Sequence, residues 1–138
     1  MATRATIGRV TDEGYIRYIY SHWDGYLDGV GATLLENYNT TAQVEELLNH
    51  GDVSSLADTI EDTTFYHRNW GEEYTMVCPL ETDSLSDLKE EFAYVWTGSE
   101  WVARVDGVWY RLAYIVQAEI ADVERVVLGR EVAGQVAY

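Results

Sequence analysis

The stretch AYVWTGSEWVARVDGVWYRL, residues 93–112, decides the fold that we expect for this chain. It contains three short runs rich in valine, tryptophan and tyrosine, and such residues favour strands. Thr97-Gly98-Ser99-Glu100 reads as a first turn, and Asp106-Gly107 between apolar runs is a strong hairpin signal. The stretch therefore predicts a three-stranded antiparallel meander with strands at residues 93–96, 101–105 and 108–112.

A second hairpin is predicted near the N-terminus. Residues 3–10 are β-branched and mixed in polarity, Thr11-Asp12-Glu13-Gly14 reads as a turn, and residues 15–20 are dense in aromatic residues and isoleucine. Two short helices follow as an αα-hairpin on the sheet, one over residues 30–38 and one that Thr40 or Thr41 caps and Gly51 ends. Glu45 is expected in the first turn of the second helix, near the positive end of its dipole.

The other segments are assigned from composition and spacing. Gly25, Gly29 and Gly31 predict a loop, and residues 52–56 a loop or short turn. The remaining elements are strands at 63–66 and 74–78, a short acidic helix from Asp83 or Ser84 through Phe92, an amphipathic helix at 113–129, and an end at 131–138 that is frayed or at a subunit contact.

These elements predict one α+β domain over residues 1–138, with a motif-bearing half at 1–78 and the meander and C-terminal helix at 79–138. In this fold an antiparallel sheet, built from the N-terminal hairpin and the meander, is covered by short helices. Trp96, Trp101 and Trp109 are expected in its core.

Charge is the strongest signal in the composition. The 138 residues include 24 acidic side chains against nine Lys and Arg, for a net charge of −15. Such a charge repels nucleic acids and anionic membranes and attracts basic protein surfaces, although it also keeps a tyrosine-rich protein soluble. One cysteine excludes an internal disulfide framework, and no apolar run is long enough to cross a bilayer. We therefore expect a cytoplasmic protein that binds neither membranes nor nucleic acid directly.

Two aromatic-polar clusters mark the expected interaction site. Tyr20-Ser21-His22-Trp23-Asp24-Gly25-Tyr26 places rings that favour burial beside a histidine and a carboxylate that favour water or a partner. His67-Arg68-Asn69-Trp70-Gly71-Glu72-Glu73 has the same character. The candidate interaction residues are His22, Trp23, Asp24, Tyr26, Arg4, Tyr66, His67, Arg68 and Glu72.

Catalytic and metal chemistry are less favoured by these residues. His22, Asp24 and His67 are the residue types of an open transition-metal site, but His67 is more than forty residues from the other two and nothing in the sequence predicts that they converge, so we assign no metal or cofactor. His22 with Asp24 or Glu72 is an acid–base pair without a nucleophile motif, so we favour a binding role over catalysis. His50, at a helix end, is expected to be a cation that stabilises the helix C-terminus.

The first 75 residues resemble a family of small, uncharacterised proteins encoded by tailed bacteriophages and prophages. The resemblance is carried by Thr3-Arg4-Ala5-Thr6-Ile7, the Tyr20–Tyr26 motif with its His-Trp-Asp-Gly-Tyr core, Val30-Gly31, Leu34-Leu35, Tyr38, Gly51–Leu56, Tyr66-His67-Arg68 and Gly71-Glu72. In that family a cysteine often stands at the position of Ser21. The resemblance implies a phage setting and supplies no activity.

We therefore expect a phage-encoded acidic binding protein in the host cytoplasm. It would inhibit or redirect a host factor with a basic surface, in host defence or host takeover. Two alternatives stay open. One is a protein that binds or sequesters a small nucleotide, or a phosphoester hydrolase, using the His22–Asp24 loop with Arg4 and Arg68 and amides near Gly29. The other is a self-assembling structural protein that forms a homo-oligomer.

Overall fold

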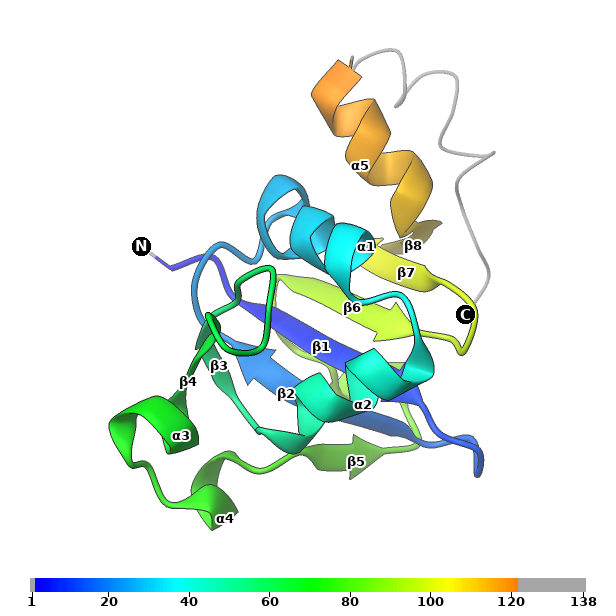
Figure 1. The fold of residues 1–138 in the computed structure, drawn as a ribbon. Helices are drawn as coiled ribbons and strands as arrows, with labels where there is room; N and C mark the ends of the chain where they lie inside the picture. Colours follow the sequence, from blue (N-terminus) through cyan, green and yellow to red (C-terminus); the bar gives the residue numbers. More distant parts are fainter. Residues whose placement is uncertain (1, 122–138) are drawn as a thin grey trace.

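The computed structural model describes residues 2–121 (Figure 1). Its strands lie in one sheet in the order β4-β3-β2-β1-β6-β7-β8, and β5 pairs with β2 off this path. The strands are β1 (Ala5–Val10), β2 (Ile16–Ser21), β3 (Val53–Ser55), β4 (Thr64–Phe65), β5 (Leu80–Thr82), β6 (Phe92–Trp96), β7 (Trp101–Val105) and β8 (Val108–Arg111). The helices are the π-helical turn η1 (Leu27–Gly31), α1 (Ala32–Asn37), α2 (Thr41–Asn49), α3 (Tyr66–Trp70), α4 (Tyr74–Val77), the 3₁₀ turn η2 (Leu85–Asp87) and α5 (Leu112–Ala121).

The predicted hairpin and meander are both confirmed. β1 and β2 are antiparallel with Ile7 opposite Ile19, and β6, β7 and β8 form an antiparallel meander. Asp106 and Gly107 have φ angles of +52° and +80°, which is the left-handed conformation that a two-residue hairpin turn requires at both positions. Local sequence therefore determines these five strands.

The prediction of a purely antiparallel sheet is wrong, because the sheet is mixed. β1 pairs in parallel with β6, and β2 pairs in parallel with β3. Both connections are long: α1 and α2 lie between β2 and β3, and most of the chain lies between β1 and β6. A connection of a dozen or more residues can return the chain to the end of the sheet at which the first strand began, so that the next strand runs parallel to it. A tight turn cannot do this.

Several local predictions also need correction. Residues 52–56 contain strand β3, the strand predicted at 74–78 is instead helix α4 over Tyr74–Val77, and the expected helix at 83–92 shrinks to η2. Gly29 and Gly31 belong to η1 instead of a loop. The helix predicted at 113–129 is present as α5 from Leu112, but its remainder past 121 and the 131–138 end lie outside the described residues.

The core lies between the sheet and the helices α1, α2 and α5, which cover one face in Figure 1. Trp101 and Tyr94 are buried there, and their polar atoms are paired: the Trp101 indole donates to the Tyr38 carbonyl at 2.7 Å, and the Tyr94 hydroxyl donates to the Gly25 carbonyl at 2.7 Å. On the opposite face Val102 and Trp109 pack with Leu88 and three further side chains. The prediction that Trp96, Trp101 and Trp109 are core residues is confirmed. None of the helices in the described part of the chain has the length and apolar character of a membrane span.

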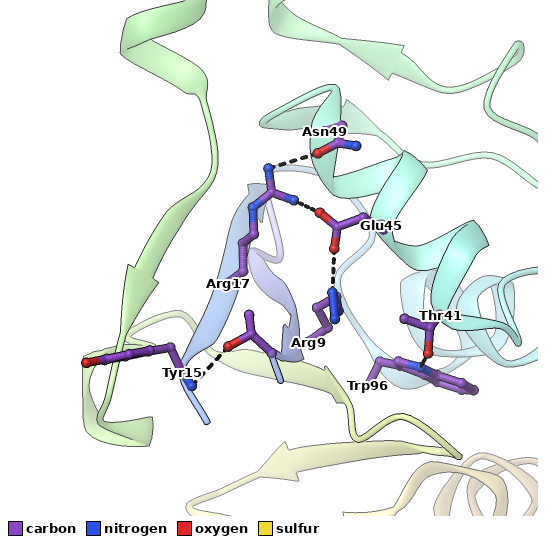
Figure 2. Close-up of polar contacts among 8 residues, drawn as sticks. Arg9, Tyr15, Arg17, Thr41, Glu45, Asn49 and Trp96 are labelled. Carbon is purple, nitrogen blue, oxygen red and sulfur yellow. Dashed lines mark hydrogen bonds and ion pairs between the residues drawn. The ribbon is translucent and has the colours of Figure 1, made fainter. Parts of the chain in front are cut away.

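Glu45 joins helix α2 to the sheet (Figure 2). Its carboxylate accepts from Arg9 at 2.6 Å and also binds Arg17, which in turn donates to Asn49 at 2.8 Å. Thr40 caps the helix as predicted, accepting from the Gln43 amide. Glu45 is the fifth residue of α2, so the expected position in its first turn is wrong. The carboxylate instead lies between two arginines that face each other across β1 and β2.

Candidate functional site

The Tyr20–Tyr26 motif forms the end of β2 and the turn that follows it. The amides of His22 and Trp23 donate to the carbonyls of Val53 and Ser54, both at 3.0 Å, so the first residues of the motif lie beside β3. Asp24 then takes a left-handed φ of +58°, and the Gly25 amide donates to the Thr3 carbonyl at 2.8 Å. A Cβ at position 25 would lie 2.7 Å from that carbonyl oxygen, which explains the glycine.

The side chains of the motif bind mainly one another. The Tyr20 hydroxyl contacts His22 Nδ1 at 2.5 Å, and the His22 ring packs edge-on against Trp23 with centroids 4.7 Å apart. The Tyr26 hydroxyl donates to Asp24 at 3.0 Å, and this hydrogen bond raises the pKa of Tyr26. Trp23 is 46% exposed, so the motif presents one indole to solvent.

Tyr20 is the point at which predicted site residues meet. The pKa of its hydroxyl is raised, because burial outweighs the lowering effect of the nearby Arg4 guanidinium, and Tyr66 and Glu90 also act on it through their charge. With its contact to His22, Tyr20 thus brings together Arg4, His22 and Tyr66.

The remaining predicted residues lie in other local groups. His67 Nδ1 contacts the Glu72 carbonyl oxygen at 2.7 Å, and the His67 ring packs edge-on against Tyr74. Arg68 lies 4.9 Å above the Phe65 ring and donates to the Thr63 and Glu61 carbonyls. These predicted residues therefore form three separate groups: Asp24 with Tyr26, His67 with Glu72, and Arg68 with Phe65 and two backbone carbonyls.

Asp52 is a site residue that the sequence analysis missed. It lies between α2 and β3, and its carboxylate accepts from the Tyr20 amide at 2.9 Å. Its own amide donates to the Val77 carbonyl, and its carbonyl accepts from the Tyr66 amide. Burial raises the pKa of this carboxyl from 3.8 to about 6, and the Tyr20 amide only partly offsets the increase. A perturbed carboxyl beside a hollow is typical of functional sites.

One hollow adjoins both Asp52 and β5, and a second adjoins β5. The first has a volume of about 270 Å³ and is lined by Thr6, Tyr18, Ile19, Tyr20, Asp52, Leu80, Asp87, Lys89 and Glu90. The second has a volume of about 400 Å³ and is lined by Tyr15, Glu81, Thr82, Asp83 and Asp87. None of the nine residues predicted for the site lines either hollow. Within residues 2–121 no three His, Cys, Asp or Glu side chains gather as a metal site would require.

His50 differs from its predicted role. Burial is the main cause that lowers the pKa of His50, and this disfavours the cation expected there. The ring stacks on Phe65 with centroids 4.5 Å apart. His50 therefore packs as an aromatic ring at the end of α2, where burial works against the charge that the sequence led us to expect.

The Asp52 carboxyl predicts a pH dependence of stability. Because its pKa in the folded protein, about 6, exceeds its ordinary value of 3.8, the folded state binds more protons between these values, and the free energy of unfolding falls as pH rises through that range. Asp52→Asn keeps an oxygen for the Tyr20 amide. We expect it to be more stable than wild type by about 1 kcal/mol at pH 7, after allowance for solvent screening, and equal at pH 4. Urea denaturation at both pH values measures this, with the exposed Asp62→Asn as control; equal pH dependence in wild type and Asp52→Asn would contradict it.

Comparisons of the chain with protein-family models, curated proteins and solved structures found no match. The resemblance of its first 75 residues to phage proteins stays a prediction.

Proposed function

We propose that this chain is an acidic binding protein that docks on a basic protein through an arm formed by residues 66–78. The arm contains α3 and α4 and extends from the β4 side of the sheet in Figure 1. In the phage setting that the resemblance implies, the partner is a host protein in the host cytoplasm, which the chain inhibits or redirects.

The observation that carries the proposal is that neither helix of the arm buries a side chain, although both are rich in large apolar residues. Trp70 is 59% exposed, Met76 75% and Tyr74 36%. Exposed apolar side chains of this size that gather on one segment are typical of interfaces, and Trp and Tyr often supply most of the binding energy there.

Charge selects the kind of partner. Residues 69–88 include five acidic side chains and no Lys or Arg. The nearest preceding cation, Arg68, is already held by backbone carbonyls. A second copy of the chain would bring a like-charged segment to the contact, which repulsion disfavours. The arm therefore suits a protein surface with an apolar depression surrounded by Lys and Arg.

The carboxylates elsewhere support the same choice. Of the acidic side chains described up to residue 116, only Glu45 and Glu100 form ion pairs. The cations Arg9, Arg17, Arg104 and Arg111 contact acceptors of the chain itself. The surface field is thus negative, and it speeds encounter with a basic partner.

Retention of proteins from a bacterial lysate on the immobilised chain tests the proposal. We expect one protein to be retained at low salt, released as salt is raised, and retained at least tenfold less by Trp70→Ala. Tyr114→Ala removes an aromatic residue that is 47% exposed on α5, and this variant should retain the lysate protein as well as wild type does. Glu72→Lys/Glu73→Lys should abolish retention, whereas Glu61→Lys/Asp62→Lys, with the same net charge, should weaken it only slightly.

Two outcomes would contradict the proposal. One is that no retained protein distinguishes Trp70→Ala from Tyr114→Ala. The other is that retention does not depend on salt, because screened charges cannot then contribute to the contact. Circular dichroism of each variant checks that the fold is intact.

A further inference from the structure

The 270 Å³ pocket lies where the edge of β2 is shared by two strands. Residues 16–18 of β2 pair with β5, whereas Ser21 pairs with β3. Between them the Tyr20 amide has no strand partner and donates to the Asp52 carboxylate instead. Thr6, Tyr18 and Tyr20 line the pocket together with Ile19, and these three alternate along β1 and β2 with Ile7 and Ile19, which belong to the helix-covered core. The pocket thus opens on the face of the sheet opposite the helices.

The lining of the pocket has the chemistry of a cation site with aromatic walls. Asp52, Asp87 and Glu90 line it with a single cation, Lys89. Two tyrosines, at positions 18 and 20, supply rings, and aromatic rings attract guanidinium and ammonium groups. Because Asp52 is half-buried, a cation beside it gains more than at an exposed carboxylate.

Size and position limit the ligand. Pockets for drug-sized ligands measure roughly 300–1,000 Å³, so about 270 Å³ suits a single side chain. The pocket is also tied to the arm, because the backbone of Asp52 bonds to Tyr66 and to Val77 at the arm's two ends. Leu80, which lines the pocket, is 58% exposed just after the arm.

We propose that this pocket receives an arginine side chain of the basic partner, with the guanidinium between the tyrosine rings and the carboxylates. A guanidinium stacks on aromatic faces and donates in a planar fork, which suits this lining better than a compact ammonium. The partner's identity as a basic protein rests on the function proposed above, but the pocket's preference for a guanidinium can be measured without any partner.

The test is a titration of the full chain with N-acetyl-arginine methylamide, followed by amide chemical shifts. Its control probe is N-acetyl-citrulline methylamide, which has nearly the same shape and no charge. We expect saturable shifts at Tyr18, Tyr20 and Asp52 with the arginine probe and at least tenfold weaker binding of the citrulline probe. The lysine analogue should bind more weakly than arginine; equal or tighter binding would overturn the choice of arginine.

Variants with matched charge locate the site. Glu90→Gln and Asp52→Asn should each weaken binding of the arginine probe at least fivefold. Glu91→Gln removes the same charge from an exposed neighbour that does not line the pocket, and it should leave binding unchanged. Lys89→Ala removes the competing cation and should strengthen binding severalfold.

The outcomes separate this inference from the proposed function. If the arginine and citrulline probes bind equally or not at all, or if Glu91→Gln weakens binding as much as Glu90→Gln, the pocket is no guanidinium site. The arm can still bind a partner in that case. If the probe binds as expected but no lysate protein distinguishes the arm variants, the docking proposal fails and the pocket site stands.

Discussion

Replacing Trp101 with alanine is expected to lower the free energy of unfolding by about 3–5 kcal/mol. The Trp101 side chain is 2% exposed, in the centre of the core between β7 and the helices. Its ring packs edge-on against Trp96 with centroids 5.6 Å apart, and its indole N–H donates to the Tyr38 carbonyl at the end of α1. The substitution therefore leaves a large cavity and also an unpaired buried carbonyl.

Urea denaturation measures this loss as a lower midpoint at an unchanged slope. Trp101→Phe keeps a six-membered aromatic ring but removes the pyrrole part of the indole together with its N–H donor, so it should cost about 1–3 kcal/mol. Trp70→Ala is the matched control: the same residue is removed from a position that is 59% exposed, and the change should stay within about 0.5 kcal/mol. Similar losses for the two alanine variants would contradict the burial of Trp101.

The strand that contains Trp101 could be predicted because the signals for it are local in sequence. This strand lies between a Gly-containing turn and an Asp-Gly turn, and both turns are specified by residues adjacent in sequence. The parallel pairing of β1 with β6 has no such signal, because Ala5 and Phe92 are brought together by contacts along the whole intervening chain. The meander could thus be predicted, and the mixed character of the sheet could not.

The candidate site also has a part that the sequence predicts and a part that it does not. Exposed Trp23 and Trp70 lie in clusters that the sequence marks by their composition, so the aromatic part of the surface was accessible to prediction. Asp52 gives no such signal, since an aspartate after a glycine reads as an ordinary turn residue. Its raised pKa and its bond to Tyr20 arise only because β3 and β5 share the edge of β2 and leave a break.

Glu45→Ala is expected to lower the free energy of unfolding by about 2 kcal/mol. Arg9 and Arg17 lie directly opposite each other on β1 and β2, and like charges in such pairs repel. Glu45 binds both in Figure 2, and their side chains are only 13% and 22% exposed. Removing one partner of a largely buried ion pair costs up to 3–5 kcal/mol, and partial exposure of Glu45 reduces that figure.

The neighbouring Glu46 distinguishes this contact from an effect of the helix dipole. Glu46 is exposed, lies in the same turn of α2, and changes the net charge equally when replaced. If the dipole were the main interaction, Glu45→Ala and Glu46→Ala would have similar small effects that salt removes. Since Glu45 instead bridges two largely buried arginines, its variant should lose about 2 kcal/mol in low and high salt alike, and Glu46→Ala should stay within about 0.5 kcal/mol of wild type. Equal losses in urea denaturation would show that the bridge does not hold α2 to the sheet.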